Sequence, residues 1–419
     1  MRPQRGAYRN LPYVAALDPE EIEAASVTST PSLRSAIPTE SSASPAMAIR
    51  LVQIIPSLDR CGAEKQLTLL STGLERSEFD VQVCVLTRSG PYAEVLQQHG
   101  IPLHFIDKRF KFDPLAMLRL TRLIKRLSPD IVQTWLFAAN SYGRLAARWA
   151  GVPHTIASER CVDAWKVDHE LIIDRWLARR SSRIVVNSPA VRDYYVERGI
   201  PAEKFRVIAN AVEIPQEPAA GERERLCQSV GIPSQARLIG VLGRLWPQKR
   251  IKDAIWAADL LKVVRDDVHL IVLGDGPQRA RLERFRDQVE IRDRVHLLGH
   301  RDDAIAWLPH LLCLWCTSEY EGQSNSVLEA LAAGIPVVAT DIPGNRDLVV
   351  DGHSGLLFPV GDRAKLARCT MQLLEDTNLA RRLADAGRQH VASAFALPRM
   401  LSEYRDLYRQ LMESSSQQP

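Results

Sequence analysis

The sequence predicts an α/β fold built from two similar halves, each a parallel β-sheet covered by helices. Short apolar runs alternate with stretches of helical period along most of the chain, which is the pattern of strand–helix units in parallel sheets. The alternation lapses once, over residues 214–236, where prolines and charged residues accumulate. A chain of 419 residues is also longer than one ordinary hydrophobic core supports. We therefore expect two domains joined by a linker with a short helix.

The composition limits the class of protein. Hydrophobic residues make up 46% and charged residues 25%, as in globular proteins that live in water. A formal net charge of +4 is too small to favour nucleic acid as a partner. No apolar run reaches the roughly 20 residues of a membrane span, and no secretion signal opens the chain. Seven scattered cysteines favour a reducing compartment over a disulfide framework. We expect a cytoplasmic protein.

The first half of the chain contains seven predicted strands. Residues 1–46 are poor in large apolar side chains and show no period, so we expect them to be disordered. Residues 47–213 then form the N-terminal domain. Its predicted strands, separated by helical patterns, are 48–58, 80–87, 102–107, 130–136, 154–159, 183–188 and 205–210.

The second half repeats the pattern. Residues 237–390 form the C-terminal domain, followed by a helix over 391–413 and a disordered tail over 414–419. The predicted strands of this domain are 237–245, 269–276, 294–300, 311–316 and 336–340.

The clearest indication of a binding site lies between residues 318 and 361. Glu321 and Glu329 stand eight residues apart, across the junction between the loop after strand 311–316 and a predicted helix. A helix that starts after a buried strand presents free N–H groups and a positive dipole end to a phosphate. The two carboxylates suit the hydroxyl groups of a ribose and a sugar. Glu329 has an alternative role, because Ser326 and Glu329 also have the spacing of a helix capping box.

Two more loops follow strands of the same predicted sheet. In the first, Arg244 can hold two phosphate oxygens and Lys249 adds a compact positive charge, although a solvated basic loop has the same composition. In the second, Gly274 and Gly276 permit close approach of a ligand to the backbone, and a tight turn explains them equally well. No glycine-rich dinucleotide or P-loop sequence follows a strand. The lone pair Cys313 and Cys316 has no partner pair, so we expect no metal site.

Together these motifs resemble the retaining glycosyltransferases of family four, which have the GT-B fold. In the first domain, residues 61–65 (CGAEK) are similar to the family's G-G-A-E loop, and residues 207–213 (VIANAVE) to its N-G-V-D turn. The segments that match in the second domain are GRL-x3-K (243–249), LGDGP (273–277), EG-x6-E (321–329), EALAAGIPVVATDIPG (329–344) and DG-x2-GLL (351–357).

The resemblance implies two Rossmann-like domains facing a cleft, with the last helix crossing back to the first domain. It implies a nucleoside-diphosphate-sugar donor and no cofactor or metal. The implied catalytic residues are Arg244 and Lys249 on the donor diphosphate and Glu321 on the transferred sugar. Glu329 would accept hydrogen bonds from the ribose. The remaining implied donor-binding residues, which act through their backbone or by close approach, are Gly62, Gly243, Gly274, Gly276, Ser326 and Val327.

The acceptor side departs from the family. Many relatives carry a histidine in the loop after the fourth or the fifth strand, whereas Asn140, Glu159 and Arg160 stand in these places here. We take these three as candidate acceptor-side residues.

A basic segment over residues 101–127 has two interpretations. It carries seven Lys or Arg, and Leu115, Leu118, Leu123 and Leu127 recur at helical spacing. The leucines can pack on the sheet while the charges face water. Alternatively, the segment attaches the protein to an anionic membrane surface, close to a lipid-linked acceptor.

The sequence thus predicts a retaining glycosyltransferase that moves a sugar from a nucleoside-diphosphate-sugar to a glycan or a lipid-linked acceptor, in polysaccharide or cell-envelope biosynthesis. Two alternatives stay open. One is a sugar-nucleotide epimerase or hydrolase of the same fold, and the other is a non-catalytic sugar-nucleotide-binding protein.

Overall fold

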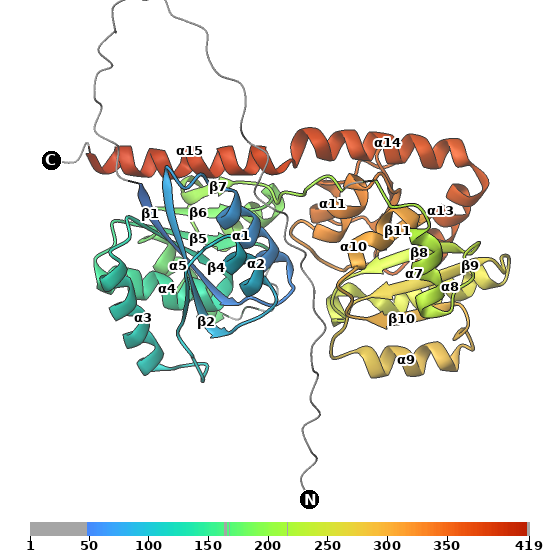
Figure 1. Cartoon of the computed structure of the whole chain (residues 1–419), viewed down its shortest axis with the longest axis horizontal. Helices are drawn as coiled ribbons and strands as arrows, with labels where there is room; N and C mark the ends of the chain where they lie inside the picture. Colours follow the sequence, from blue (N-terminus) through green and yellow to red (C-terminus); the bar gives the residue numbers. More distant parts are fainter. Residues whose placement is uncertain (1–47, 163–165, 167, 216, 417–419) are drawn as a thin grey trace, which may run out of the picture. The chain divides into compact units, whose positions relative to one another are not determined.

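The computed structural model describes residues 48–162, 166, 168–215 and 217–416. The segment 1–46, for which we expect disorder, lies outside the described residues. The described residues form two parallel sheets with helices packed on them, as predicted (Figure 1).

The first sheet contains all seven predicted strands. Its order is β3-β2-β1-β4-β5-β6-β7, and every neighbouring pair is parallel. The central strand β1 aligns Leu51 with Val81 on one side and with Ile131 on the other. The strands are β1 (Ile49–Ser57), β2 (Phe79–Arg88), β3 (Leu103–Phe105), β4 (Ile131–Trp135), β5 (His154–Glu159), β6 (Arg183–Val186) and β7 (Phe205–Val207).

Six α-helices connect these strands. They are α1 (Gly62–Gly73), α2 (Tyr92–Gln98), α3 (Pro114–Leu127), α4 (Leu136–Ala150), α5 (Asp168–Ala178) and α6 (Pro189–Glu197), with a 3₁₀ turn η1 (Ala202–Lys204) before β7.

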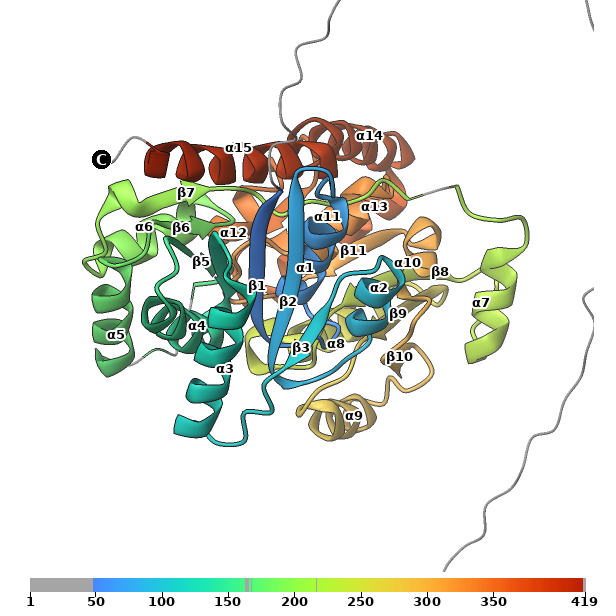
Figure 2. The same ribbon diagram turned by 60° about the vertical axis from the view of Figure 1, so that its left-hand side comes forward.

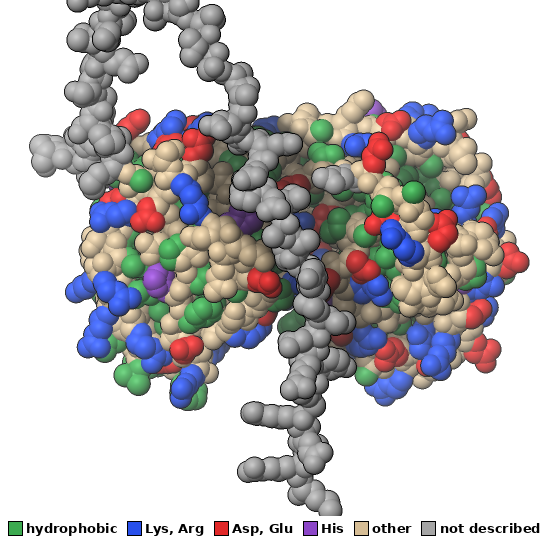
Figure 3. All heavy atoms as spheres, in the orientation of Figure 1, with side chains coloured by type: hydrophobic (Ala, Val, Ile, Leu, Met, Phe, Trp, Pro, Cys, Tyr) green, Lys and Arg blue, Asp and Glu red, His purple; other side chains and the backbone are tan. Residues whose placement is uncertain are grey.

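Helix α3 is built from the basic segment, and only part of the predicted stripe is buried, because Leu123 and Leu127 pack on the core whereas Leu115 and Leu118 do not. It begins where the Asp113 side chain accepts a hydrogen bond from the N–H of Ala116. Its buried side chains include Leu120 and Ile124, which pack in the core under β1 and β2. Leu115 and Leu118, which the predicted stripe assigned to the sheet, are 66% and 44% exposed. Figure 3 shows basic and apolar side chains together over the part of the surface where α3 lies in Figure 1.

The second sheet has six strands in the order β10-β9-β8-β11-β12-β13, again all parallel. The sequence indicated the first five of them. The edge strand β13 was not predicted, because three residues are too few to show a period. The strands are β8 (Arg237–Leu242), β9 (Val268–Leu273), β10 (Val295–Gly299), β11 (Cys313–Cys316), β12 (Val337–Thr340) and β13 (Leu356–Phe358).

The helices of this half are α7 (Glu222–Val230), α8 (Ile251–Lys262), α9 (Arg279–Gln288), α10 (Ala304–Trp307), α11 (Asn325–Ala332), α12 (Pro343–Arg346) and α13 (Arg363–Glu375), with 3₁₀ turns η2 (Pro247–Lys249) and η3 (Leu308–His310). Helix α7 lies in the segment 214–236, where the sequence predicts a linker with a short helix.

Two helices, α14 (Thr377–Ala394) and α15 (Leu397–Ser416), end the described chain, and the crossing helix predicted over 391–413 spans the end of α14 and most of α15. They meet at Phe395 and Ala396 and run end to end in both ribbon views (Figures 1 and 2). Helix α14 packs in the second half, and α15 packs into the core of the first sheet. Because α15 continues to Ser416, the first residues of the predicted tail are helical, and residues 417–419 lie outside the described residues.

None of the described helices combines the length and the apolar character that crossing a membrane requires.

Candidate active site

Three loops meet at the carboxyl edge of the second sheet. They follow β9, β8 and β11, which are neighbours in the sheet. Because these strands are parallel, all three loops leave the sheet at the same edge, which is where open α/β sheets bind ligands. The loops carry Gly274 and Gly276, then Arg244 and Lys249, and finally Glu321.

The loops after β8 and β9 are packed directly on one another. The N–H of Leu245 donates to the carbonyl of Asp275 at 2.9 Å. A Cβ atom on Gly274 would lie 2.0 Å from the carbonyl oxygen of Gly243, and the φ of both glycines is +147°. The packing of the two loops therefore requires glycine at position 274, and the positive φ favours glycine at position 243.

Lys249 and Glu321 form an ion pair between the loops after β8 and β11. The Lys249 Nζ lies 2.5 Å from Glu321 Oε1, and the Ser318 hydroxyl donates to the same oxygen at 2.6 Å. Burial of Lys249 disfavours its charged form, but the Glu321 carboxylate outweighs this effect, and the pKa of Lys249 is raised. The ammonium group therefore stays charged at neutral pH, although the Lys249 side chain is only partly exposed to solvent.

Arg244 is the exposed cation of the same group. Its guanidinium lies 5.3 Å from the ring centre of Trp246. Among the described residues it forms no ion pair, so its hydrogen-bond donors are available to a ligand. Its positive charge acts on Glu64 and Cys61, which stand at the start of α1 in the first half.

Helix α1 of the first half contacts helix α11 of the second half. The Asn325 side-chain amide donates to the carbonyl of Gly62 at 3.1 Å. One turn further along both helices, the Lys65 Nζ lies 2.5 Å from Glu329 Oε1. This contact brings Gly62, predicted from the first-domain motif, to the elements that carry the other predicted donor residues.

Glu329 does not act as a helix cap. Helix α11 begins at Asn325, so Ser326 and Val327 lie inside its first turn and no capping box forms with Ser326. The N-cap residue, Ser324, also makes no side-chain capping bond. The first N–H groups of α11 therefore have no side-chain cap, and Glu329 faces Lys65 instead.

Glu64 is a buried acid that was not among the predicted site residues. This carboxyl group is 4% exposed, in the first turn of α1, and its Oε2 has no hydrogen-bond partner. Its other oxygen accepts a bond of 3.5 Å from the Ser57 hydroxyl. Burial raises the pKa of Glu64 to about 7, and the nearby Arg244 opposes this effect. The sequence feature that could have indicated Glu64 is its place as the acidic residue of the CGAEK motif.

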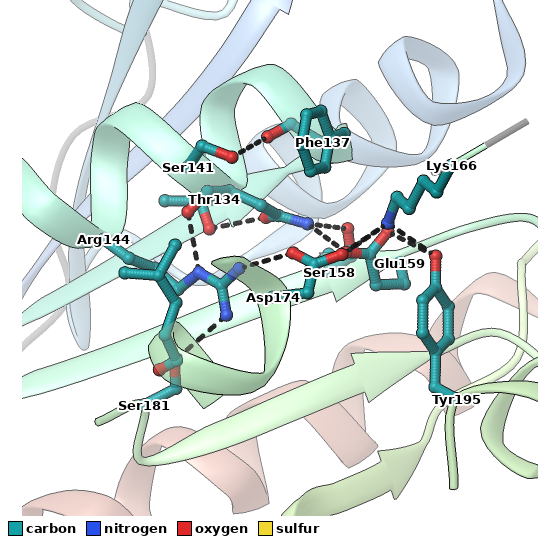
Figure 4. Close-up of polar contacts among 12 residues, drawn as sticks. Thr134, Phe137, Ser141, Arg144, Ser158, Glu159, Lys166, Asp174, Ser181 and Tyr195 are labelled. Atoms are coloured by element: carbon teal, nitrogen blue, oxygen red, sulfur yellow. Dashed lines mark hydrogen bonds and ion pairs between the residues drawn. The ribbon is translucent and has the colours of Figure 1, made fainter. Parts of the chain in front are cut away.

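All three predicted acceptor-side residues are buried, and two of them belong to one polar network. Asn140 is 0% and Glu159 5% exposed, and the Asn140 amide donates to Glu159 Oε1 at 2.8 Å. Glu159 also pairs with Lys166, whose Nζ lies 2.8 Å from Asp174. Asp174 in turn accepts from Arg144 at 3.1 Å. Figure 4 shows these charges of opposite sign facing one another between α4, α5 and the end of β5.

Arg160, the third of these residues, lies against the Glu321 loop. A Cβ atom on Gly322 would stand 2.2 Å from the Arg160 carbonyl oxygen, so the two backbones are in close contact. The Arg160 guanidinium donates to the Tyr404 hydroxyl of α15 at 2.5 Å and lies over the Trp135 ring. The backbone of Arg160 therefore touches the loop that carries Glu321.

Comparison with known proteins gives the family. Residues 61–215 match the family described as Glycosyltransferase Family 4, and residues 222–390 match Glycosyl transferases group 1. The chain is 29% identical to the 2-deoxystreptamine glucosyltransferase of Streptomyces kanamyceticus, over 84% of the chain and 95% of that protein. It is 24% identical to an Escherichia coli protein named UDP-Gal:alpha-D-GlcNAc-diphosphoundecaprenol alpha-1,3-galactosyltransferase, over 85% of the chain and 95% of that protein.

The fold also matches solved structures. The structure of Anabaena HepE in complex with UDP and glucose superposes with a TM-score of 0.78 at 22% identity, over 86% of this chain and all of that one. The two family matches together cover more than half of the chain, and they meet in the segment between the two sheets. This chain is therefore a glycosyltransferase of family four with the GT-B fold.

Proposed function

We propose that this glycosyltransferase is retaining and metal-independent, and that it moves a sugar from a nucleoside-diphosphate-sugar to a glycan or lipid-linked acceptor in polysaccharide or cell-envelope biosynthesis. The observation that carries the proposal is the group formed by Arg244, Lys249 and Glu321. It combines an unpaired guanidinium with an ammonium–carboxylate pair at one edge of the sheet.

In this proposal the two cations stabilise the leaving diphosphate. The bond between the sugar's anomeric carbon and the phosphate oxygen breaks, and negative charge grows on the diphosphate. Arg244 and Lys249 stabilise that charge, and Lys249 is held in position before the reaction begins by its ion pair with Glu321. The acceptor hydroxyl attacks from the same face and passes its proton to the departing phosphate, so the sugar keeps its anomeric configuration. Glu321, held by Ser318 and Lys249, orients the sugar.

Helix α11 holds the other end of the donor. The uncapped N–H groups around Ser326 and Val327 suit the distal phosphate. Glu329 lies one turn further along and accepts hydrogen bonds from the ribose hydroxyls. Gly243, Gly274 and Gly276 keep the neighbouring loops close enough for the backbone to reach the donor.

A uridine nucleotide is the first donor to test, because HepE was solved with UDP and with UDP-glucose, and the Escherichia coli relative is named for UDP-Gal. A thermal-shift screen over UDP-, GDP- and ADP-sugars identifies the base. Transfer to candidate acceptors is then followed by NMR, which also reads the anomeric configuration of the product. An inverted product contradicts the retaining mechanism.

The same experiments separate the alternatives. An epimerase or hydrolase consumes the donor without any acceptor, whereas a binding protein is stabilised by the donor and transfers nothing. Substituting Arg244→Ala or Lys249→Ala lowers transfer at least about 100-fold, on the scale of losing one preorganised donor to a developing charge. Arg225→Ala, an exposed residue of α7, serves as the control. Near-normal rates in both site variants contradict the donor assignment.

The surface of α3 and of the residues just before it favours binding to an anionic membrane, where the protein would encounter its acceptor. Four large apolar side chains stand in water there, together with the seven cations of this segment. They are Phe110 (69% exposed), Phe112 (81%), Leu115 (66%) and Leu118 (44%). Apolar side chains that insert among lipid headgroups, surrounded by basic residues, are typical of proteins that lie on a membrane surface.

Flotation with vesicles tests this part of the proposal. The protein is expected to float with vesicles containing anionic lipid at low salt, less at high salt, and much less after Phe110→Ser/Phe112→Ser. Val263→Ser/Val264→Ser, an exposed apolar pair at the end of α8, is the matched control. Binding that is absent, or unaffected by salt, contradicts the membrane role.

A further inference from the structure

A second pocket lies behind the donor loops, between α8, α9 and the start of α13. Its volume is about 560 Å³, within the range of small-molecule sites in proteins. None of the proposed donor-binding residues lines it. The turn η2 separates the two sites, because Lys249 faces Glu321 whereas its neighbour Arg250 lines the pocket.

The lining of this pocket is strongly positive. Its cations are Arg250, Lys252, Arg281, Arg284 and Arg363, and its only acid is Asp253. Both oxygens of Asp253 are already engaged. Arg250 Nε lies 2.7 Å from Oδ2, and Arg363 Nε lies 2.8 Å from Oδ1.

Three of the five cations have no acidic partner. In the part of the chain that the structure describes, no ion pair is formed by Lys252, Arg281 or Arg284. Arg281 and Arg284 stand one turn apart on the same face of α9, so their charges repel one another. Such a concentration of like charge is unfavourable in the empty protein and favourable once an anion is bound.

Aromatic rings sit among these cations. Phe285 and Trp256 are stacked at 5.6 Å between ring centres. Lys252 Nζ lies 4.4 Å from the Phe285 ring centre, and the Arg363 guanidinium 5.0 Å from that of Trp256. The pocket therefore offers an aromatic wall, formed by Phe285 with Trp256 stacked behind it outside the lining, and several phosphate-binding groups.

We infer that this pocket is a second binding site, for a small phosphorylated molecule, distinct from the donor site. Arginine side chains bind phosphate through two parallel hydrogen bonds, and two of them without acidic partners share one face of α9. The aromatic wall suits a ring attached to the phosphate. This inference does not depend on the donor or the acceptor of the transfer reaction.

Calorimetric titration of pyrophosphate into the full chain at low salt tests the site, in the presence of saturating UDP to fill the donor site. The wild-type protein is expected to bind one equivalent. Arg281→Ala/Arg284→Ala lowers the affinity at least about tenfold, because two charged hydrogen-bond donors are lost. Arg381→Ala/Arg382→Ala removes the same charge from exposed positions of α14 and leaves the affinity unchanged. Phenyl phosphate is expected to bind more tightly than methyl phosphate, and Phe285→Leu removes the difference.

Three results overturn the inference. One is an absence of pyrophosphate binding to the wild-type protein. Another is an equal loss of pyrophosphate affinity in both double variants, because the loss would then follow from the change in net charge and not from this pocket. The third is pyrophosphate binding that is seen without UDP and lost with saturating UDP, and that Arg281→Ala/Arg284→Ala leaves intact. That result assigns the anion to the donor site. Failure of UDP to bind contradicts the proposed uridine donor instead. The comparison of the two double variants still tests the second pocket in that case.

Discussion

Glu64 is a buried acid placed where the two halves of the chain meet. It lies in the first turn of α1, with Oε2 unpartnered and the charge of Arg244 nearby. Because burial raises its pKa to about 7, against 4.5 for the free side chain, the folded protein holds this proton at a pH where the unfolded chain releases it. Folding is therefore favoured at low pH by this group. That contribution is lost as pH rises from about 4.5 through about 7.

Replacing Glu64 with glutamine removes this pH dependence. Glu64→Gln cannot ionise, so its stability relative to the wild-type protein is expected to increase between pH 5 and pH 8, by on the order of 3 kcal/mol. Urea unfolding at both pH values measures the difference, with the exposed Glu203→Gln as control. An unchanged difference between wild type and Glu64→Gln at the two pH values contradicts the raised pKa.

The buried network around Lys166 depends on every one of its charges. Lys166 Nζ contacts Glu159, Asp174 and the Tyr195 hydroxyl, all of them buried. Lys166→Met leaves two carboxylates with less compensation, and breaking a buried pair in this way costs about 3–5 kcal/mol. Urea unfolding measures the loss. Adding Glu159→Gln is expected to restore part of it, and a loss below about 1 kcal/mol excludes the network as a source of stability.

The positions of single residues were predictable from sequence where a loop follows a strand. Arg244, Lys249 and Glu321 follow neighbouring strands, and the order of parallel strands brings such loops together. Glu329 was ambiguous, because the position at which α11 begins decides whether a capping box forms. The burial of Asn140 and Glu159 could not be predicted, since it depends on how α5 packs against α4.

At the scale of helices, α1 and α11 form the contact that joins the two halves beside the donor loops. Gly62, Lys65 and Gln66 share one face of α1, and Asn325 and Glu329 share one face of α11. The position of the proposed ribose ligand, Glu329, is therefore set partly by the first half of the chain.

Lys65→Met is expected to weaken UDP binding about tenfold, because Glu329 loses the charge-assisted bond that orients it. Titration with UDP and with its 2′,3′-dideoxy analogue isolates the ribose contribution. The wild-type protein prefers UDP, and the variant discriminates less. Lys262→Met, on the exposed end of α8, is the control. Undiminished discrimination in Lys65→Met rules out the positioning role.

The elements themselves were largely predictable, because buried strands and amphipathic helices have distinct periods. Twelve strands were indicated in order, and the described structure adds the short β13. The buried face of α3 was predicted correctly for Leu123 and Leu127 and incorrectly for the other two leucines. Four leucines at helical spacing suggest one stripe, yet two of them are exposed beside Phe110 and Phe112. Apolar periodicity alone does not distinguish a helix face that packs in the core from an apolar helix face that is exposed.

At the scale of the molecule, α15 belongs to the core of the first half. Its side chains pack among those of β1, β2 and α1, and the Tyr408 hydroxyl donates to the buried Gln133 at 2.5 Å. The five buried side chains that it contributes to this core are Met400, Tyr404, Leu407, Tyr408 and Leu411.

A chain that ends at residue 396 is therefore expected to lose the folded first half. Five large buried side chains are worth roughly 10 kcal/mol together, which is comparable to the whole stability of a typical domain. Limited proteolysis is expected to degrade residues 48–213 of this variant rapidly. A chain that ends at residue 412 keeps all five side chains and resists digestion. Equal resistance of the two truncated chains contradicts the role of α15.

The position of α15 also has a consequence for biosynthesis. A ribosome makes this helix after the strands of both sheets, so the core on the sheet that emerges first stays incomplete until residues 397–416 have been translated. During that interval the apolar surface later covered by Tyr404 and Tyr408 is open to solvent, where it can associate with other nascent chains. Emergence of α15 from the ribosome, rather than emergence of the first sheet, thus sets the moment at which this half can reach its native state, and a chaperone is most useful to the protein before that moment.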